Sequence, residues 1–331
     1  MQSMFYERAR DRAHALSLTQ QPGARLIGGG TNLLDLVKGD VEHPARLVDI
    51  GRIGLDQIAE QAGGGLLIGA MARNSDTANH PLVRQRYPLL SQALLSGASP
   101  QLRNMASMGG NLMQRPRCGY FTDVAFDMCN KRMPGSGCGA REGFNRMHAI
   151  LGHSPSCIAA NPSDMNVALA ALDARIRIAS SAGERVVPIG EFHRLPGSTP
   201  QVETVLQPGE MIVAVELPAS PFALHAHYLK VRDRASYAFA LVSVAAALDI
   251  DAGVVRGARI AVGGVAHKPW RLAAAEAALV GRPLSEQSSR KAADLLLAGA
   301  RGFKDNQFKI KLAHKAVMRA LSLAANPEGS A

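Results

Sequence analysis

The stretch from Ala24 to Gly39, ARLIGGGTNLLDLVKG, decides the fold of this chain. A short apolar run ends at three consecutive glycines, and a second apolar run begins at Leu33. Because glycine has no Cβ, the backbone N–H groups of such a turn can converge on an anion. The stretch therefore predicts a strand and then a tight turn that can hold a phosphate. A plain hairpin without a ligand is the alternative.

The dinucleotide-binding fingerprint G-x-G-x-x-G invites comparison with this turn, and the turn departs from it. Gly28 and Gly30 occupy the first two glycine positions, but Leu33 occupies the third. A large side chain there would prevent the close packing of helix on strand that the fingerprint requires. The glycines therefore disfavour a Rossmann fold while still allowing the turn to bind an anion.

Two further segments carry the same chemistry. NMASMGGNL, residues 104–112, is a second small-residue turn that contains Ser107, Gly110 and Asn111. Two glycine-rich turns that are each followed by asparagine suit two segments that grip one extended diphosphate cofactor. NPSDM adds Ser163 and Asp164, and a carboxylate at such a turn can accept hydrogen bonds from a ribose.

The order of the expected elements indicates two units, since 331 residues exceed the size of most single cores. In the first unit, a helix that stops at Gly97 is predicted for HPLVRQRYPLLSQALLSGAS. A helix that runs into a strand is predicted for SDMNVALAALDARIRIAS, and a strand is predicted for GEMIVAVELP. From near residue 220, HAHYLKVRDRASYAFALVSVAAALDI and VVRGARIAVGGVA predict long antiparallel strands. Helices follow, including NQFKIKLAHKAVMRALSLAA. A frayed tail is expected at residues 326–331.

Composition and charge disfavour several classes of function. Hydrophobic residues make up 47% and charged residues 19%, as in an ordinary soluble protein with a sizeable core. No segment is long and apolar enough for a membrane span, and from the residues at the N-terminus we expect no self-contained secretory signal. The net charge of +10 is spread along the chain and aromatic residues are only 5%, which disfavours nucleic-acid binding. A basic face that docks an acidic partner subunit is expected instead.

The order and spacing of the motifs resemble one known family. IGGGTNLLDL, LRNMASMGGNLMQ, NPSDM and KVRDRASYAFALVSVA are similar to the FAD-binding medium subunit of the molybdenum hydroxylases, the xanthine dehydrogenase and aldehyde oxidoreductase family. The resemblance runs from about Tyr6 to Leu323. With its cysteine-bearing insertion, the chain looks closest to the FAD and [4Fe–4S] subunit of bacterial periplasmic aldehyde oxidoreductases. The β subunit of 4-hydroxybenzoyl-CoA reductase is a similar relative.

The resemblance implies an α+β fold in two domains. Residues 1–220 would form a PCMH-type (vanillyl-alcohol-oxidase-like, VAO-like) FAD-binding domain of two lobes, with the cysteine-bearing insertion at about residues 115–160. Residues 221–331 would form a small α+β C-terminal domain of the CO dehydrogenase flavoprotein type, with a three-stranded antiparallel sheet.

The resemblance also implies which residues hold FAD. The backbone of the first turn would wrap the diphosphate, and Ser107, Gly110 and Asn111 would hold the phosphate and ribitol region. Asp164 would bind the adenosine side, and Ile212 would pack on the cofactor. Lys230 would lie near the isoalloxazine, where its charge favours the anionic reduced flavin; an exposed lysine on a strand edge is the alternative. The residues of the first turn are Leu26, Ile27, Gly28, Gly29, Gly30, Thr31, Asn32 and Leu33.

All four cysteines of the chain fall within one segment: Cys118, Cys129, Cys138 and Cys157. No pair has the C-x-x-C spacing of zinc ribbons, thioredoxins or bacterial ferredoxins. The glycines and prolines around them suit loops that curl round a compact object, and the neighbouring Lys and Arg side chains would favour thiolates. From the residues alone, a metal centre is favoured, and disulfides, a zinc ion and free thiols stay open.

The resembling subfamily implies a [4Fe–4S] cluster bound by these four cysteines. Such a cluster would also staple an insertion that lacks a clear apolar face. His148 and His153 lie in the same segment, and we interpret both as surface or loop histidines because four cysteines are already available.

By resemblance, the chain is the electron-transfer flavin subunit of a heterotrimeric, molybdenum-dependent aldehyde oxidoreductase. A large molybdenum-cofactor subunit would oxidise the substrate, and a small subunit with two [2Fe–2S] clusters would pass electrons to FAD. An external acceptor would then receive them, and no catalytic residue is expected in this chain. Co-export with a signal-bearing partner would place it in the periplasm; otherwise it is cytoplasmic. A stand-alone FAD-dependent reductase of the same fold and a zinc-binding scaffold are the alternatives. The aldehyde, the acceptor, the stoichiometry and the redox or structural role of the cluster stay open.

Overall fold

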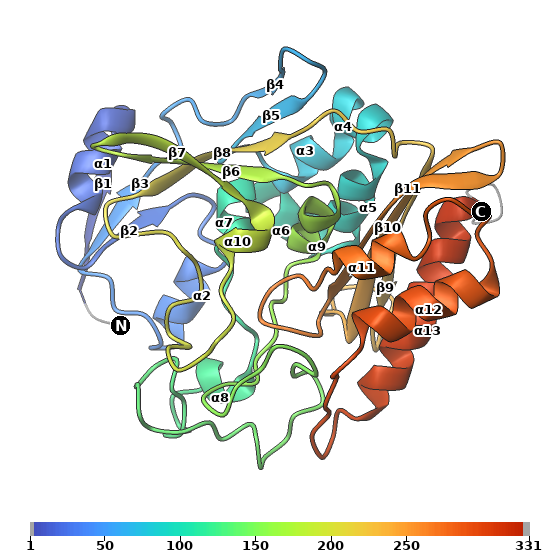
Figure 1. The fold of residues 1–331 in the computed structure, drawn as a ribbon. Coiled ribbons are helices and arrows are strands. Elements are labelled where there is room, and N and C mark those ends of the chain that lie inside the picture. Colours follow the sequence, from blue (N-terminus) through green and yellow to red (C-terminus); the bar gives the residue numbers. More distant parts are fainter. Residues whose placement is uncertain (1–2, 327–331) are drawn as a thin grey trace.

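Three β-sheets organise the chain in a computed structural model that describes residues 3–326 (Figure 1). A small parallel sheet near the N-terminus lies at the left of the view, and a five-stranded antiparallel sheet crosses its top. A three-stranded antiparallel sheet and the last helices lie at the right. The loops of the cysteine-bearing insertion form the bottom of the molecule in this view.

The parallel sheet is built around the opening sequence stretch. Strand β2 (Ala24–Ile27) and strand β1 (Phe5–Arg8) pair with opposite sides of β3 (Arg46–Asp49). Helix α1 (Arg12–Thr19) is capped by the Asp11 side chain and buries its apolar face with Val48 in one small core. The apolar run after the glycines forms helix α2 (Leu33–Lys38), so the predicted strand and tight turn are confirmed.

The five-stranded sheet has the order β4-β5-β8-β6-β7. Its central strand β8 is buried at all but one position, because one face packs on the N-terminal core and the other on the main core. The predicted strand GEMIVAVELP and the predicted helix-to-strand segment SDMNVALAALDARIRIAS are both confirmed. The strands are β4 Ile58–Glu60, β5 Leu66–Gly69, β6 Arg175–Ser180, β7 Gly183–Pro188 and β8 Met211–Leu217. The associated helices are α3 Asn74–Asn79, α6 Pro100–Met105, α7 Met108–Leu112, α9 Asp164–Ala171 and α10 Ile189–Phe192.

The segment predicted as one helix ending at Gly97 is two helices, α4 (Pro81–Arg86) and α5 (Pro88–Ser96). Tyr87 between them leaves the helical conformation, with φ −134° and ψ 52°. Pro88 disfavours the helical conformation in the residue before it and cannot donate a backbone hydrogen bond, so one helix ends and the next begins there. The predicted stop at Gly97 is confirmed.

The C-terminal sheet has the order β11-β10-β9, and both pairs are antiparallel. The longer of the two segments predicted as strands is two strands, β9 (His225–Val231) and β10 (Val242–Asp251), joined by a loop in which Tyr237 has φ 50°. Alternate residues of β10 face two different cores, because side chains along a strand point to opposite faces. The remaining elements are β11 Val254–Gly263, α11 Ala273–Ala277, α12 Glu286–Leu296 and α13 Phe308–Ala325.

The cysteine-bearing insertion has little regular structure. Its one helix is the short α8 (Gly119–Thr122), and isolated bridges join Cys129 to Cys138 and Ser154 to Cys157. The α+β class and the three-stranded antiparallel C-terminal sheet are confirmed. Most of the predicted tail, from Pro327 onward, lies outside the described residues.

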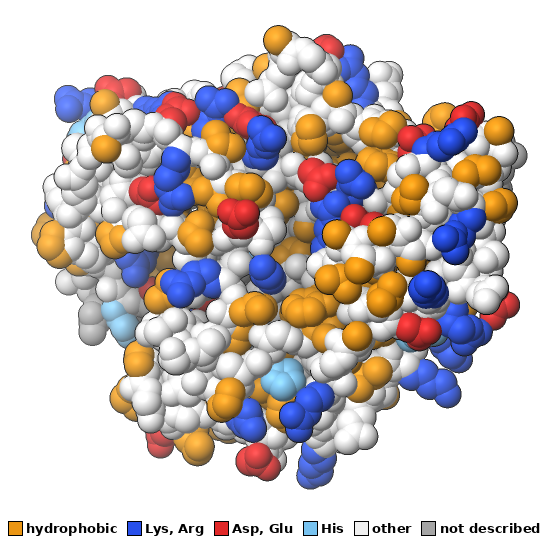
Figure 2. Space-filling view, in the orientation of Figure 1, with side chains coloured by type: hydrophobic (Ala, Val, Ile, Leu, Met, Phe, Trp, Pro, Cys, Tyr) orange, Lys and Arg blue, Asp and Glu red, His pale blue; other side chains and the backbone are white. Residues whose placement is uncertain are grey.

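The helices and the surface charge bear on the predictions about membranes and basic faces. Across residues 3–326, every helix is too short or too polar to cross a bilayer. On the face shown in Figure 2, Lys and Arg side chains are interspersed with Asp and Glu.

Candidate functional site: two glycine turns and a cysteine cavity

The first glycine turn presents a run of free backbone donors. Within the described part of the chain, the N–H groups from Gly28 to Leu33 donate to no protein acceptor, and Gly30 has φ 73°. Leu33 is the first residue of α2, so the run leads into the N-terminus of that helix. Consecutive unpaired N–H groups with a left-handed residue among them form an anion-binding nest, and the helix dipole adds positive potential.

The second turn lies directly against the first. A Cβ added to Gly29 would lie 2.6 Å from the carbonyl carbon of Met105, and one added to Gly28 would lie 3.2 Å from Ser107 Oγ. Asn32 Nδ2 donates to Gly110 O at 3.4 Å. The absence of side chains at these glycines is therefore what allows the two turns to touch.

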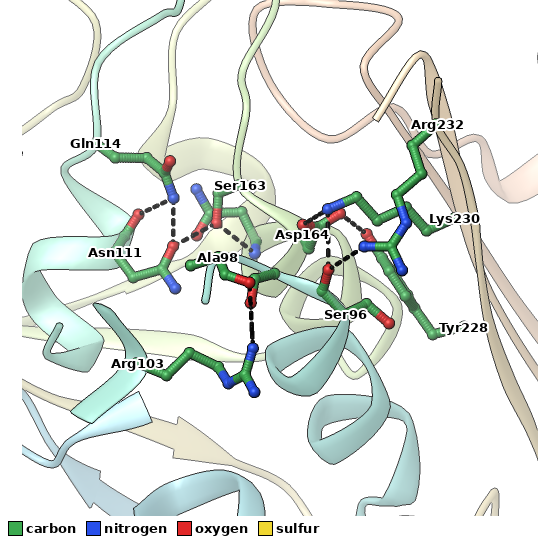
Figure 3. A network of polar contacts seen from close by, with 12 residues as sticks. Ser96, Ala98, Arg103, Asn111, Gln114, Ser163, Asp164, Tyr228, Lys230 and Arg232 are labelled. Atoms are coloured by element: carbon green, nitrogen blue, oxygen red, sulfur yellow. Dashed lines mark hydrogen bonds and ion pairs between the residues drawn. The ribbon is translucent and has the colours of Figure 1, made fainter. Parts of the chain in front are cut away.

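Ser107 and Asn111 of the second turn are held by specific hydrogen bonds. Ser107 Oγ caps helix α7 by accepting from the Gly110 N–H at 3.2 Å. Ser163 Oγ donates to Asn111 Oδ1 at 2.8 Å, and Gln114 also donates to that oxygen (Figure 3). The three segments that sequence analysis connected therefore meet at one place.

Asp164 and Lys230 form a buried ion pair (Figure 3). Lys230 Nζ lies 2.7 Å from Asp164 Oδ2, and the two side chains are only 4% and 8% exposed. Tyr228 donates from its hydroxyl to Asp164 Oδ1 at 2.7 Å, and burial raises the pKa of Tyr228 well above its usual value. Lys230 also donates to Ser96 O at 3.0 Å.

This pair bears on three sequence interpretations. The roles of Asp164 on the adenosine side and of Lys230 beside the isoalloxazine stay predictions. The alternative of an exposed lysine on a strand edge is wrong, because β9 is an edge strand but Lys230 points into the protein.

Cationic side chains donate hydrogen bonds to the carbonyl groups at the C-terminal end of helix α5. Lys230 and Arg232 both donate to Ser96 O, and Arg103 donates to Gly97 O at 2.7 Å (Figure 3). Cations are stabilising at a helix C-terminus, where carbonyl groups lack partners. Tyr228 and Arg232 were not predicted from the sequence. Tyr228 lies two positions from Lys230 and therefore on the same face of β9, and Arg232 directly follows the end of that strand.

Arg117 contacts both the first glycine turn and the loop between β9 and β10. Its guanidinium donates to the side-chain oxygen of Asn32 and lies over the ring of Phe239, 5.2 Å from the centroid. Burial lowers the pKa of Arg117. Because Cys118 is the next residue, the Arg117 side chain joins the first glycine turn directly to the cysteine-bearing insertion.

The other predicted cofactor contacts lie in the surrounding strands. Leu26 is half-buried in β2. Ile212 is buried in β8 opposite Ile178, as part of the main core. Its packing on a cofactor stays a prediction.

His193 forms a hydrogen bond to the end of helix α7, and its lowered pKa makes the stability of the fold depend on pH. Its Nε2 donates to Leu112 O at the end of α7 at 2.9 Å, and complete burial lowers its pKa to about 4. Folding therefore favours the neutral ring, and this contribution is complete above the ordinary pKa of 6.5. It is lost progressively as the pH falls from 6.5 toward about 4.

We expect His193→Gln to remove this pH dependence while keeping an N–H donor for Leu112. Between pH 7 and pH 5, the wild type should lose about 2 kcal/mol of unfolding free energy through His193. The difference between variant and wild type should shift by that amount in favour of the variant, as measured by urea unfolding at both pH values. An unchanged difference would contradict the assignment.

The four cysteines line one small cavity in the insertion. All four are free thiols, and Cys129 and Cys157 are buried. The cavity is enclosed by residues from the whole insertion: Cys118, Tyr120, Phe121, Met128, Cys129, Asn130, Lys131, Cys138, Ala140, Ser156, Cys157 and Ala159. The tertiary structure therefore gathers cysteines that the sequence spaces widely.

The thiols differ in their protonation. A hydrogen bond from Cys157 lowers the pKa of Cys138 to about 6, and the same bond raises the pKa of Cys157. Burial raises the pKa of Cys118 to about 11. Lys131, whose ammonium donates to Pro200 O at 2.7 Å, acts against the rise at Cys157 through its charge. Within residues 3–326, no three His, Cys, Asp or Glu side chains form a ready-made site for a metal ion.

Of the interpretation of His148 as a surface or loop histidine, the loop is confirmed and the surface position is wrong. Its side chain is buried, and its Nε2 lies 3.1 Å from Cys118 Sγ. His153 is partly exposed and packs edge-on against Phe303, with the ring centroids 4.9 Å apart. Spacing could not separate the two histidines, because both lie in the same irregular loop.

Comparison with known families defines the class of protein. Residues 2–220 match the family described as the FAD binding domain in molybdopterin dehydrogenase, and residues 227–324 match the CO dehydrogenase flavoprotein C-terminal domain. The two glycine turns thus belong to an FAD-binding protein. The chain belongs to the FAD-binding medium subunits of the molybdenum hydroxylase family, as its motifs predicted.

The chain is also similar to individual proteins of this family. The chain is 50% identical to the aldehyde oxidoreductase FAD-binding subunit PaoB of Escherichia coli (strain K12), over 98% of this chain and 99% of that protein. It is 26% identical to the carbon monoxide dehydrogenase medium chain of Hydrogenophaga pseudoflava, over 96% of each. The crystal structure of quinoline 2-oxidoreductase from Pseudomonas putida 86 matches with a TM-score of 0.76 and 27% identity, over 98% of each chain.

These comparisons confirm the predicted two-lobed FAD domain followed by a small antiparallel C-terminal unit. The chain is a subunit of an oxidoreductase, and the molybdenum centre of this family lies on a partner chain.

Proposed function

We propose that the chain is the FAD-containing electron-transfer subunit of a molybdenum-dependent aldehyde oxidoreductase. The observation that carries this proposal is the 50% identity, over nearly the full length, to an aldehyde oxidoreductase FAD-binding subunit. FAD accepts and delivers one or two electrons, so it can link single-electron carriers to a two-electron acceptor. The residues of this chain hold and orient the flavin rather than act on the aldehyde.

The two glycine turns supply the grip on FAD. The unpaired N–H groups from Gly28 to Leu33 are suited to the diphosphate, since a nest stabilises anionic oxygens. Ser107, Gly110 and Asn111 lie beside that nest and are assigned to the phosphate and ribitol region. The Asp164–Lys230 pair lies beyond Asn111 and Ser163, and we assign it to holding the end of the site opposite the nest.

The cysteine cavity is assigned to a [4Fe–4S] cluster. Four thiols that face one cavity are the donor set of such a cluster. A single zinc ion is the alternative for four thiolates, and metal and sulfide analysis distinguishes the two. Lys131 is buried at the cavity wall, where it pairs with Glu203 at 3.1 Å and its positive charge also lies near the thiols.

The remaining parts of the enzyme are proposed from the same resemblance. A large molybdenum-cofactor subunit and a small subunit with two [2Fe–2S] clusters would complete a heterotrimer, and an external acceptor would receive the electrons. Co-export with a signal-bearing partner would place the chain in the periplasm. Direct reduction of the isolated chain by a nicotinamide cofactor would instead favour a stand-alone reductase.

The wild-type chain, purified with its partners, is expected to contain one FAD and about four iron and four acid-labile sulfide per chain. Cys157→Ser should remove at least half of the iron and sulfide, because a serine hydroxyl is a poor ligand for these clusters. Flavin content should stay close to the wild-type value, since Cys157 is not among the turn residues. Flavin absorbance, iron analysis and sulfide analysis measure the three quantities.

Ser154→Ala is the matched control, because Ser154 lies in the same loop but does not line the cavity. It should leave iron content unchanged. Zinc in place of iron, or intact disulfides by mass spectrometry, would contradict the cluster but not the flavin assignment. Absence of bound flavin would contradict the proposed function itself.

A further inference from the structure

His148 makes a polar side-chain contact with a cysteine sulfur. Its ring is 6% exposed, and Nε2 lies 3.1 Å from Cys118 Sγ. The other ring nitrogen, Nδ1, is buried and has no partner among the described residues. The ring is therefore oriented toward Cys118 by one polar contact.

We propose that His148 is a positioning residue of the cysteine site, in which its Nε2–H donates a hydrogen bond to the thiolate of Cys118. This inference rests on the proposed cluster, because only a metal-bound Cys118 is permanently a thiolate. A thiolate has no hydrogen to give, so the nitrogen that faces it must be the donor. Both the neutral Nε2–H ring and the doubly protonated ring carry that hydrogen, so the direction of the bond does not depend on the charge of His148.

The C-terminal unit holds His148 in this position. Lys309 Nζ donates to His148 O at 2.8 Å and to Gly264 O at 2.5 Å, and Asn306 Nδ2 donates to His148 O at 3.1 Å. Lys309 and Asn306 are both 0% exposed. Among the described residues Lys309 has no carboxylate partner, so carbonyl groups alone accept from its amino group. A fully buried amino group of this kind is costly unless its hydrogen bonds are rigidly placed, which fixes the backbone that carries the histidine.

The expected consequence is a higher reduction potential for the cluster. Hydrogen bonds to cluster sulfurs stabilise the reduced, more negative state, and partners of this kind are among the means by which proteins tune Fe–S centres. In this arrangement the last helices of the chain contribute to the properties of a centre that lies in an insertion of the first domain.

The test compares His148→Leu with His148→Gln in the assembled enzyme. Leucine removes the donor, whereas the glutamine amide can place an N–H close to the position of Nε2. At a fixed ambient potential, His148→Leu should lower the ratio of reduced to oxidised cluster about tenfold, which corresponds to 59 mV for one electron. His148→Gln should stay closer to wild type. EPR-monitored redox titration measures the cluster, and flavin absorbance follows the FAD in the same samples.

His153→Leu is the control, because His153 lies in the same insertion but contacts Phe303 and no cysteine. It should not change the cluster potential. A measurement on the wild type does not depend on the folding of a variant. With ¹⁵N-histidine labelling, pulsed EPR of the reduced cluster should detect a weakly coupled histidine nitrogen.

The outcomes separate the two proposals. Iron and sulfide present, with an unchanged potential in His148→Leu and no histidine coupling, would overturn the role of His148 while leaving the cluster in place. Iron missing from the wild type would overturn the cluster and this inference together, and flavin binding would be unaffected.

Discussion

Gly29→Ala is expected to weaken FAD binding strongly. The new Cβ would overlap the carbonyl group of Met105, 2.6 Å from its carbon, and that group belongs to the backbone of helix α6. A backbone carbonyl cannot rotate away as a side chain can, so the two glycine turns must separate. Overpacking of this kind costs about 1–3 kcal/mol, and FAD affinity should fall at least about tenfold because both turns contribute to one site.

FAD per chain, released by denaturation and measured by absorbance, gives the result together with the thermal midpoint. Gly190→Ala is the matched control, because Gly190 has no atom within 4 Å of an added Cβ and no positive φ. It should bind FAD as the wild type does. Wild-type affinity in Gly29→Ala would show that the close approach of the two turns is unimportant for the flavin.

Breaking the Asp164–Lys230 pair from one side should be strongly destabilising. Within residues 3–326, Lys230→Met leaves the buried Asp164 carboxylate with Tyr228 as its one partner, and Asp164→Asn leaves the Lys230 ammonium without an anion. Removing one partner of a buried ion pair costs about 3–5 kcal/mol, because the other charge stays buried. Both variants should also lower flavin occupancy, since the pair adjoins Ser163 and Asn111.

The double variant Asp164→Asn/Lys230→Met tests the cause. It should be less destabilised than the sum of the single variants by about 2–3 kcal/mol, since neither charge is left unpaired. Urea unfolding of all four proteins measures the cycle. Arg256→Met is the control, because the Arg256–Asp251 pair is 59% and 69% exposed and should contribute less than about 1 kcal/mol. Single variants as stable as this control would contradict a buried, energetically important pair.

Local signals in the sequence were sufficient for the glycine turns and the order of elements. The apolar run before three glycines predicted the strand and the tight turn, whereas helix α2 after them was not predicted. The helix boundary at Pro88 was missed as well, although the missing N–H group of proline is a local signal for it. The family could be recognised because several such motifs occur in one order. These features depend on residues close together in the chain.

Contacts between distant segments could not be predicted in the same way. Asp164 and Lys230 are separate motifs in the sequence, and only the packing of α9 against the C-terminal sheet brings them to 2.7 Å. The Tyr228 hydroxyl joins them because it shares a face of β9 with Lys230. Sequence spacing carries no information on such distances.

The sequence by itself determined that this protein has two glycine turns suited to a diphosphate and four cysteines in one irregular insertion. The tertiary structure decided that the two turns touch, that the four thiols line one cavity, and that His148 rather than His153 faces Cys118. The physical reason is that backbone conformation follows from neighbouring residues. The approach of one loop to another follows from the burial of apolar surface across the whole fold.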